Sequence, residues 1–321
     1  MSAGAAPMMP LRIARAFTAA DGIRSFELVA PAGGLLPPFT AGSHIKVRVP
    51  NGELRKYSLC NDPGERHRYL ITVKRELAGR GGSVSLVDGA REGDIVPGSA
   101  PDNAFPLVAT ASRHLFIAGG IGITPIRSMI CSLGEQPNTP WTLYYLTRSP
   151  EATAFLEELS SPELRRNVFI HHDYGDPARS FDLWPALEHP QPGAHLYCCG
   201  PRELMEAVRD MCGHWPHSNV HFESFTERGS ARLDDRPFLV RLTRSGRAFE
   251  IPVGKTILEI LRNSGCSVTS SCESGTCGTC RTVLLAGAAD HRDMVLLPEE
   301  MSGQIMICVS RARSGELVLD L

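Results

Sequence analysis

The chain has 321 residues, of which 42% are hydrophobic and 21% are charged, and its formal net charge is −2. A chain of this length is long enough for two or three domains, each with its own core. The near-balanced charge argues against a strongly charged partner, so we expect binding neither to nucleic acid nor to an anionic membrane surface.

The amino-terminal residues 1–10 are small and interrupted by prolines, and we expect a loose tail there rather than a signal peptide. No apolar run reaches the roughly 18 residues that a transmembrane helix requires. With ten cysteines and no export signal, we expect reduced thiols in the cytoplasm. Six cysteines are predicted to be mostly buried apolar side chains: Cys60, Cys131, Cys198, Cys199, Cys212 and Cys266.

Residues 11–105 predict a small antiparallel β-barrel as the first part of a multidomain chain. Three segments alternate apolar and polar residues, with Gly and Pro turns between them: Arg24–Val29, His44–Val49 and Tyr69–Lys74. Short strands at even spacing with turn signals between them are typical of such barrels.

The run Arg55-Lys-Tyr-Ser-Leu in this part is a candidate flavin site. Tyr57 can lie against a flat isoalloxazine ring, Ser58 can hydrogen-bond the N5 edge of that ring, and Arg55 supplies a charge for a phosphate. By itself the motif is weak, because such a run is a common strand end. We assign further residues of the motif and of the strand at Tyr69–Lys74 to the same site: Lys56, Thr72, Val73 and Lys74.

A glycine-rich run, Gly79-Arg-Gly-Gly-Ser, precedes a predicted helical turn. Gly81, Gly82 and Ser83 would let the backbone approach a phosphate, to which the helical turn offers free N–H groups. Alone, such a run is more often only a turn. Together, in a predicted barrel upstream of a dinucleotide fold, the two motifs resemble the flavin-binding domain of the ferredoxin–NADP reductase superfamily.

From His114 onward strands alternate with helices, which predicts a parallel sheet in an α/β nucleotide domain. The expected strands are Leu115–Ala118, Thr142–Leu146, Val168–His171 and His195–Cys198. The expected helices are a helix that Pro125 opens and that ends near Leu133, Glu151–Leu159 and Glu203–Met211.

The first of these strands leads into Ala118-Gly-Gly-Ile-Gly-Ile-Thr-Pro. This run departs from the Rossmann G-x-G-x-x-G because Pro125 stands where the third glycine would be. Gly120 and Gly122 would still allow a pyrophosphate to approach, and Thr124 adds a hydroxyl. The alternative is a tight turn that binds no ligand.

A second anchor is the run Cys198-Cys-Gly-Pro, which stands between a predicted strand and a predicted helix. In the superfamily named above a C-G-P turn borders the nicotinamide, which would assign Cys199, Gly200 and Pro201 to that site. The alternative for Cys199 is a buried thiol. Adjacent cysteines are not expected to bridge each other, since the geometry is strained.

The residues alone leave the choice between NADH and NADPH open. Thr147 and Arg148 end a strand, and an arginine there could bind a 2′-phosphate. Asp173, after the next strand, could accept from ribose hydroxyls and repel a 2′-phosphate. Phe225 can cover the free flavin face until nicotinamide displaces it, although taken alone it is more readily explained as a core aromatic.

Four cysteines near the carboxyl terminus are the most specific signal in the chain. Cys272, Cys277 and Cys280 are spaced C-x4-C-x2-C and Cys308 follows, which is the plant-type [2Fe–2S] ferredoxin pattern. Zinc sites usually show paired C-x2-C knuckles, and only one such pair occurs here. Zinc, structural free thiols or half of a disulfide framework are therefore the weaker alternatives.

The residues around these cysteines fit a small ferredoxin domain. Gly275 and Gly278 would let the loop wrap close to the cluster and aim N–H groups at its sulfurs. The polar, charged segment 227–235 before this domain is a predicted linker. The remaining predicted elements are a hairpin of Phe238–Leu242 and Ala248–Ile251, a helix over Thr256–Asn263, and short strands up to Leu321.

With its three parts in this order, the chain resembles the phthalate dioxygenase reductase family over nearly its whole length. The likeness is carried by the runs quoted above and by three others: Gly213-His-Trp-Pro, His221–Phe225 and Ala289–Met294. It implies FMN rather than FAD, NADH with Asp173 as the deciding contact, and a β-grasp fold for the ferredoxin part. The implied domains are 1–106 for FMN, 107–226 for NADH, 227–235 as linker and 236–321 for the [2Fe–2S] cluster.

The same resemblance implies a function. Electrons would pass from NADH through FMN and, one at a time, through the [2Fe–2S] cluster to a separate Rieske-type oxygenase. The implied partner is a phthalate 4,5-dioxygenase, with vanillate demethylase or carnitine monooxygenase oxygenases as alternatives. The residues expected to position the reactants are Ser58, Thr124, Cys199 and Phe225. We expect a monomer; the rival interpretations are a stand-alone flavin reductase with a zinc module and a non-enzymatic redox sensor.

Overall fold

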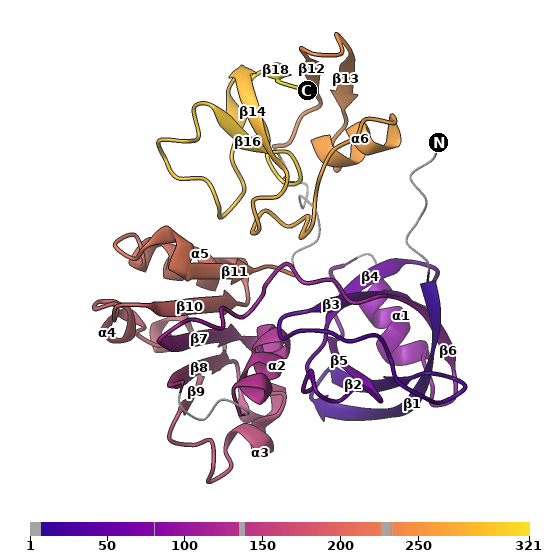
Figure 1. Ribbon diagram of the computed structural model, residues 1–321. Coiled ribbons are helices and arrows are strands. Elements are labelled where there is room, and N and C mark those ends of the chain that lie inside the picture. Colours follow the sequence, from indigo (N-terminus) through magenta and orange to yellow (C-terminus); the bar gives the residue numbers. More distant parts are fainter. Residues whose placement is uncertain (1–7, 80, 135–138, 226–231, 233) are drawn as a thin grey trace. The chain divides into compact units, whose positions relative to one another are not determined.

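The structure is a computed structural model that describes residues 8–79, 81–134, 139–225, 232 and 234–321 (Figure 1). Arg80 of the glycine-rich run and most of the expected linker 227–235 lie outside the described residues. The chain divides into two compact units that meet in the sequence between His221 and Phe222. It is a multidomain chain with three large sheets, and the domain boundaries given above remain predictions.

The first sheet is the predicted antiparallel barrel. Its strands lie in the order β4-β3-β6-β1-β2-β5, and a bridge between Leu59 and Ile71 joins the two end strands. Buried side chains at alternate positions, such as Phe26 and Ile45, fill the interior. The elements are β1 Met8–Ala20, β2 Ile23–Val29, β3 His44–Arg48, β4 Leu54–Ser58, β5 Tyr69–Lys74, α1 Gly82–Gly89 and β6 Ile95–Ser99.

The first strand begins earlier than predicted, so the expectation of a loose tail is wrong for its last three residues. Met8, Met9 and Pro10 pair with the end of β6, while pairing of β1 with β2 starts only at Arg12. The first residues of β1 therefore have one free edge, where a proline without an N–H is tolerated. Residues 1–7 lie outside the described residues.

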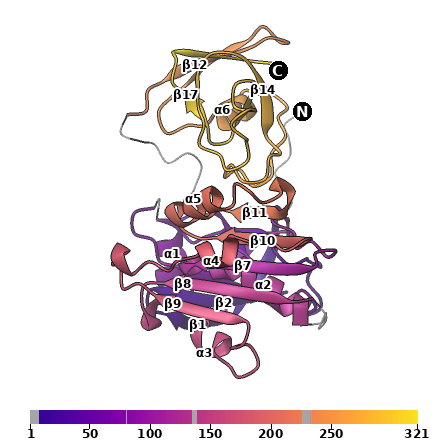
Figure 2. The same cartoon turned by 90° about the vertical axis from the view of Figure 1, so that its left-hand side faces the viewer.

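The second sheet is the predicted α/β sheet, in the order β11-β10-β7-β8-β9. Strands β10, β7, β8 and β9 are mutually parallel, and Figure 2 shows them side by side in this order. Its strands are β7 Arg113–Gly119, β8 Trp141–Thr147, β9 Val168–His172, β10 Ala194–Cys199 and β11 Val220–Glu223. Its helical elements are η1 Gly120–Gly122, α2 Ile123–Gly134, η2 Pro150–Ala152, α3 Leu156–Leu159, η3 Pro177–Arg179, α4 Trp184–Leu187, α5 Arg202–Met211 and η4 His217–Asn219.

The single helix predicted over Glu151–Leu159 is wrong. The 3-10 turn η2 and the one-turn helix α3 are separated by Thr153, which is extended, and by Phe155, which is left-handed at φ 59°. The Thr153 hydroxyl donates to the carbonyl of Ser149 over 2.7 Å. Such side-chain to backbone bonding competes with helix formation, which explains the break. The helix α2 also begins at Ile123 rather than at Pro125.

Helix α2 lies between the barrel and the α/β sheet. Its buried residues, among them Ile126 and Met129, share one core with Phe116 and Tyr145 of the sheet and with Phe105. Other barrel residues in this core are Ile23 and Ala41. One helix therefore packs on both parts of the first compact unit (Figure 1).

The third sheet belongs to the second unit and is that of a β-grasp ferredoxin. Its order is β13-β12-β18-β14-β16, with β12 and β18 parallel. Helix α6 buries Ile257, Leu258 and Leu261 against the sheet, and the hydroxyl of Thr256 caps its first turn. The elements of this unit are β12 Phe238–Leu242, β13 Ala248–Ile251, α6 Ile257–Asn263, β14 Arg281–Ala286, β15 Ala289–Asp290, β16 Gln304–Met306, β17 Arg311–Ala312 and β18 Glu316–Leu319. Strands β15 and β17 form a separate two-stranded sheet.

Among the described residues, no helix is both long enough and apolar enough to cross a bilayer.

Candidate functional site

The outer edge of β4 offers backbone groups to a ligand. The N–H of Cys60 donates across to the carbonyl of Leu70 at 2.9 Å, so Cys60 turns its backbone away from β3. Neighbouring residues of a strand alternate between its two edges. Lys56 and Ser58 stand four and two residues before Cys60, so their N–H and C=O groups lie on the same outer edge as those of Cys60.

The facing edge of β5 does the same. The N–H of Arg75 bonds the carbonyl of Gly22, on the side of β2. Val73 stands two residues before Arg75, so its backbone groups also point toward β2. Alternation leaves Thr72 and Lys74 with their backbone groups turned toward β4. Near the bridge between Leu59 and Ile71, the edges of β4 and β5 thus face each other, and their backbone groups suit a flat ring with polar atoms along its rim.

Arg55 lies against the first turn of α1. Gly81 is left-handed at φ 82°, and a Cβ on Gly82 would collide with the Nε of Arg55. The guanidinium therefore lies on the helix N-terminus, where unpaired N–H groups also favour an anion. Glu53 pairs with Arg55 at 2.7 Å. The Ser83 hydroxyl accepts from the N–H of Glu76 at 3.1 Å and donates to the carbonyl of Glu76 at 3.4 Å, so from Ser83 only the backbone is offered to a phosphate.

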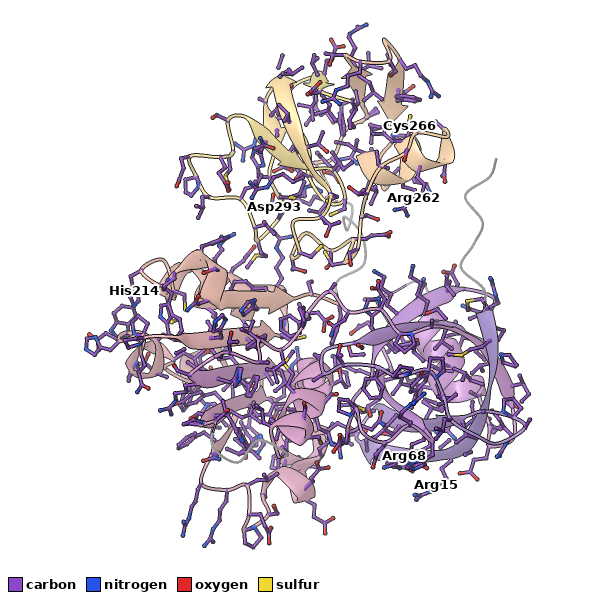
Figure 3. The ribbon with its side chains drawn as sticks, in the orientation of Figure 1. Arg15, Arg68, His214, Arg262, Cys266 and Asp293 are labelled. Atoms are coloured by element: carbon purple, nitrogen blue, oxygen red, sulfur yellow. The ribbon has the colours of Figure 1, made fainter. Side chains whose placement is uncertain are left out.

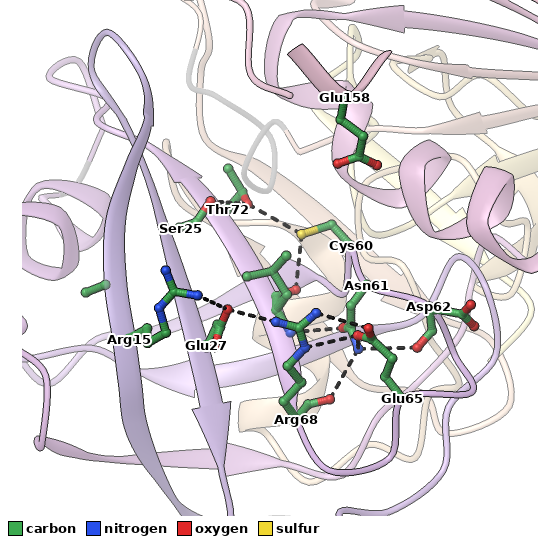
Figure 4. A network of polar contacts seen from close by, with 12 residues as sticks. Arg15, Ser25, Glu27, Cys60, Asn61, Asp62, Glu65, Arg68, Thr72 and Glu158 are labelled. Atoms are coloured by element: carbon green, nitrogen blue, oxygen red, sulfur yellow. Dashed lines mark hydrogen bonds and ion pairs between the residues drawn. The ribbon is translucent and has the colours of Figure 1, made fainter. Parts of the chain in front are cut away.

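The side chains on β5 are less available than the sequence suggested. The Thr72 hydroxyl is buried, 2.8 Å from the hydroxyl of Ser25 and 3.4 Å from the sulfur of Cys60 (Figure 4). Val73 is buried and Lys74 pairs with Glu76. Any contact that Thr72 makes with a ligand at the strand edge is through its backbone.

The nucleotide candidates lie at the carboxyl ends of β7 and β10. From β7 the chain continues to β8 on one side, while β10 lies on the other. Such a switch in strand order is where open α/β sheets bind ligands. The turn at Gly119–Gly122 and the turn at Cys199–Pro201 meet at this place.

The two turns touch backbone to backbone. A Cβ on Gly122 would overlap the carbonyl of Cys199, and one on Gly200 would come within 2.9 Å of the Cα of Gly119. These glycines are needed for the contact between the turns, a role that the spacing in the sequence did not indicate. Gly120, at φ 51°, has no atom within 4 Å of a would-be Cβ and is the glycine open to a ligand.

The polar residues predicted at this edge occupy different positions. Thr124 is buried and donates to the carbonyl of Ile121 at 3.0 Å. The Thr147 hydroxyl is 2.8 Å from the Nδ1 of His172, so it supports the strand ends. Arg148 is exposed.

Asp173 lies next to Arg148 at the ends of two neighbouring strands. The N–H of Asp173 bonds the carbonyl of Thr147 at 3.1 Å, and its carboxylate accepts from the N–H of Gly175 at 2.7 Å. The structure thus brings the two competing candidates for ribose recognition together. Both follow the carboxyl ends of strands, where such sheets bind ligands, and their order of importance stays a prediction.

Cys199 and Phe225 differ in exposure. Cys199 is fully buried, so the face it offers to a ligand is its backbone and not an open thiol. Phe225 follows β11 and is 41% exposed. An exposed aromatic side chain does not fit the core alternative, and its role as a cover for the flavin stays a prediction.

The four predicted cluster ligands form two pairs. Strand β14 starts directly after Cys280, and its first residue, Arg281, is in register with Met306, so Cys280 lies opposite Ile307, next to Cys308. A hydrogen bond from the thiol of Cys308 lowers the pKa of Cys280, and a hydrogen bond from Cys277 lowers the pKa of Cys272. In each pair the two sulfurs therefore lie within hydrogen-bond distance of each other.

Backbone donors and close packing surround the sulfurs. The N–H of Ser274 points at the sulfur of Cys272 and the N–H of Cys272 at the sulfur of Cys277, both at 3.4 Å. Gly275 is left-handed at φ 78°, and a Cβ there would come within 2.7 Å of Val309. Among the described residues no three His, Cys, Asp or Glu side chains could hold a single metal ion. Two thiol pairs with N–H donors fit a two-iron cluster, in which each iron takes two thiolates.

The segment Ala289–Met294 had no role in the sequence interpretation and supports the cluster loop in the structure. The buried carboxylate of Asp293 accepts from the N–H groups of Val295 and Leu296 at 3.1 and 2.8 Å. Its Cα would lie 3.2 Å from a Cβ on Gly275. In the sequence, only the repeated polar residues of Ala289–Met294 could have indicated this structural role.

A second support is the ion pair of Arg262 with Glu273, at 2.9 Å. Arg262 belongs to α6, and Glu273 is the left-handed residue that follows the first cluster cysteine. The pair therefore anchors the start of the cluster loop to the helix. Figure 3 labels Arg262 and Asp293, the two residues on which these supports of the cluster loop depend.

Comparison with known proteins matches these parts of the chain. An oxidoreductase NAD-binding domain matches residues 116–210, and a 2Fe-2S iron-sulfur cluster binding domain matches residues 240–313. A phthalate dioxygenase reductase of Burkholderia cepacia is 55% identical over 97% of each chain. A phthalate 4,5-dioxygenase oxygenase reductase subunit of Pseudomonas putida is 56% identical over 94% of this chain and 93% of its own.

A solved structure of a phthalate dioxygenase reductase covers 98% of both chains at 55% identity, with a TM-score of 0.75. Its description is a modular structure for electron transfer from pyridine nucleotides to [2Fe–2S]. The likeness therefore includes the barrel, the α/β sheet and the ferredoxin sheet.

Proposed function

Because this chain belongs to the phthalate dioxygenase reductase family, we propose that its electrons go to the oxygenase of a phthalate-oxidising Rieske system. The chain is an oxidoreductase that moves electrons from NADH through FMN and a [2Fe–2S] cluster to an oxygenase. The proposal for phthalate rests on one observation: two phthalate dioxygenase reductases share 55% and 56% of their residues with this chain along nearly its full length.

When bound, the cofactors convert a two-electron donor into a one-electron donor, because nicotinamide gives a hydride, FMN holds one or two electrons and the cluster carries one. The protein holds these groups in place. Arg55 and the N–H groups of Gly82 and Ser83 would hold the FMN phosphate. The backbone edges at Lys56 and Ser58 on β4 would bind the rim of the ring, and Tyr57 would lie along it.

Other residues complete the FMN and NADH sites. The edge of β5 at Thr72, Val73 and Lys74 would close the ring site from the other side. At the switch point, Gly120 would admit the pyrophosphate and the turn Cys199–Pro201 would border the nicotinamide. Thr124 would stand at the start of α2 beside both groups, and Phe225 would cover the flavin when NADH is absent.

The assignment of NADH to Asp173 follows from charge. A carboxylate repels the 2′-phosphate of NADPH and accepts from the ribose hydroxyls of NADH. The bond from Gly175 holds one oxygen of Asp173, and the other remains for a hydroxyl. Thr147 would support this residue through the bond between its carbonyl and the N–H of Asp173, and Arg148 would contact the pyrophosphate.

Cys272 and Cys277 would hold one iron, and Cys280 and Cys308 the other. The first pair is partly exposed and the second is buried, so the iron held by Cys272 and Cys277 lies nearer to the surface through which an electron leaves. We also propose a cytoplasmic location for the chain. We further propose that the chain works as a monomer.

Reconstitution tests the proposed partner. The purified holoprotein, NADH and the oxygenase component of a phthalate dioxygenase are mixed with phthalate, and phthalate loss is followed by chromatography. We expect loss that needs all components. A vanillate O-demethylase oxygenase with vanillate is the matched comparison. Turnover of vanillate without any turnover of phthalate would assign the chain to the other system and leave the reductase chemistry intact.

A further inference from the structure

Arg127 of α2 joins three segments that are far apart in the sequence. Its Nε and Nη2 donate to the carboxylate of Glu158 in α3 at 3.0 and 2.9 Å. Its Nη1 donates to the carbonyl of Cys60, just beyond the end of β4. Its guanidinium carbon lies 4.8 Å from the centre of the Phe155 ring. One side chain therefore connects the barrel, helix α2 and the segment after β8.

The connection is directional and partly shielded from water. The side chain of Arg127 is 16% exposed, and a charged donor bonded to a carboxylate in a fork forms a strong contact of defined geometry. Burial raises the pKa of Cys60 and of Cys131 to about 11, so both neighbouring thiols stay neutral. The guanidinium is thus balanced by the carboxylate of Glu158 and not by a thiolate.

The contact stands close to both candidate sites. Thr124 is one helical turn before Arg127 and lies on the same face of α2. Cys60 is two residues after Ser58. The glycine turn η1 that leads into α2 lies against β5 of the barrel. The bond from Arg127 to Cys60 therefore ties the start of α2 to the strand whose outer edge faces the expected flavin ring.

Cys60 is itself held in place by the barrel. Its thiol donates to the carbonyl of Leu70 at 3.2 Å and lies 3.4 Å from the hydroxyl of Thr72, as Figure 4 shows from close by. Its N–H also bonds Leu70. A displacement of α2 relative to β5 would have to break or bend the bond to Arg127, because Cys60 cannot follow.

The apolar contacts of α2 do not provide the same constraint. Ile126 and Met129 pack on Ile23, Ala41 and Phe105 of the barrel. Apolar contact is non-directional, so it keeps the two parts together without setting their distance along the helix. A forked, charge-assisted pair does set it.

We propose that Arg127 is a positioning residue for hydride transfer, which sets the distance between the nicotinamide at the α2 turn and the flavin between β4 and β5. This inference rests on the proposed function, because both ligands are placed there by that proposal. Arg127 touches neither ligand in this account. It acts through Cys60 and through the first turn of α2.

Two variants test it, Arg127→Lys and Glu158→Gln. Lysine keeps the charge but has no planar fork and cannot join both partners. Glutamine keeps one acceptor oxygen. The matched control is Arg244→Lys, because Arg244 makes a similar forked pair with Asp320, at 2.8 and 2.7 Å, in the other compact unit. Each holoprotein is mixed with NADH without oxygen in a stopped-flow instrument, and the loss of flavin absorbance is recorded over a range of NADH concentrations.

We expect the limiting rate constant of flavin reduction in Arg127→Lys to fall about tenfold or more, because small misplacements of reactants cost rate steeply. The apparent Kd for NADH should stay within about twofold, and the FMN content should stay at that of the control. Glu158→Gln should lie between the wild type and Arg127→Lys, since one bond of the fork remains. The control should react like the wild type.

The outcomes separate the two proposals. A wild-type holoprotein that NADH does not reduce contradicts the proposed function itself. If the wild type is reduced and Arg127→Lys keeps its limiting rate constant, Arg127 does not position the reactants. A variant that loses FMN, or one whose Kd rises while the limiting rate constant is unchanged, shows a role in binding or stability and equally overturns the inference.

Discussion

Gly122 offers a direct test of how the two turns of the nucleotide site meet. In the substitution Gly122→Ala, the new methyl group would overlap the carbonyl of Cys199 and come within 2.8 Å of the N–H nitrogen of Gly200. Both obstacles are backbone, so neither can rotate away as a side chain would. The turns after β7 and β10 have to separate to make room.

The cost follows from this geometry. Carbon atoms pack at about 3.5–4.0 Å, so the backbones must move apart by roughly an ångström. Inserting a methyl group into a packed core costs about 1–3 kcal/mol, and a backbone obstacle places Gly122→Ala near the upper end. For a unit of this size each kcal/mol lowers Tm by about 2–4 °C, so we expect a decrease of roughly 6–12 °C. NADH should also reduce the flavin more slowly, because the widened turns border the nicotinamide.

Thermal unfolding of the holoprotein, followed by circular dichroism, measures the first effect. The matched control is Gly134→Ala at the end of the same helix, where a Cβ would meet no atom within 4 Å. Alanine is the better helix former there, so this variant should be as stable as the wild type or slightly more stable. If Gly122→Ala melts at the temperature of Gly134→Ala, the two turns do not meet as described.

Four further results are expected. Arg55→Ala should weaken FMN binding about tenfold to a hundredfold, measured by equilibrium dialysis, because a charged hydrogen bond is worth about 1.5–3 kcal/mol; undiminished binding would place the phosphate elsewhere. Cys272→Ser should lose transfer to cytochrome c while NADH still bleaches the flavin, and loss of bleaching would contradict separate stations. Burial lowers the pKa of His114 and of His221 to about 4. Below the ordinary histidine pKa of 6.5 the unfolded chain binds protons at these residues and the folded chain does not, so the free energy of unfolding should fall between about pH 6.5 and 4. A constant urea midpoint over that range would contradict their burial. Thr256→Ala should cost about 1 kcal/mol, since its hydroxyl accepts from the N–H of Glu259 at 3.1 Å, and an unchanged midpoint would show that the cap is not stabilising.

Local sequence was sufficient for most elements. The alternation at Tyr69–Lys74 and the apolar run at Leu115–Ala118 predicted strands that the structure confirms, because the preference of β-branched and apolar residues for strands is a property of neighbouring residues. The spacing of Cys272, Cys277 and Cys280 predicted the cluster loop. A short loop with this spacing lets three thiolates reach one small cluster.

The two failed predictions have different causes. The helix expected over Glu151–Leu159 is interrupted because the Thr153 hydroxyl bonds Ser149 and also lies 2.7 Å from Thr147 of β8. The strand β1 starts at Met8 because β6, far along the chain, pairs with it. The partners of Thr153 are close to it in the sequence, whereas the partner of Met8 lies in a distant segment.

The chemical identity of the sites was thus contained in the sequence: which side chains can bind iron, which run can admit a phosphate, and the order of the three parts. Tertiary structure alone decided which groups face each other. The carbonyl of Cys199 leaves no room for a side chain at position 122, Thr72 turns its hydroxyl inward, and Arg127 of α2 reaches the barrel. The reason is physical. Ligand type and periodicity depend on residues that are neighbours along the chain, whereas close packing and forked hydrogen bonds depend on residues that only folding brings within a few ångströms.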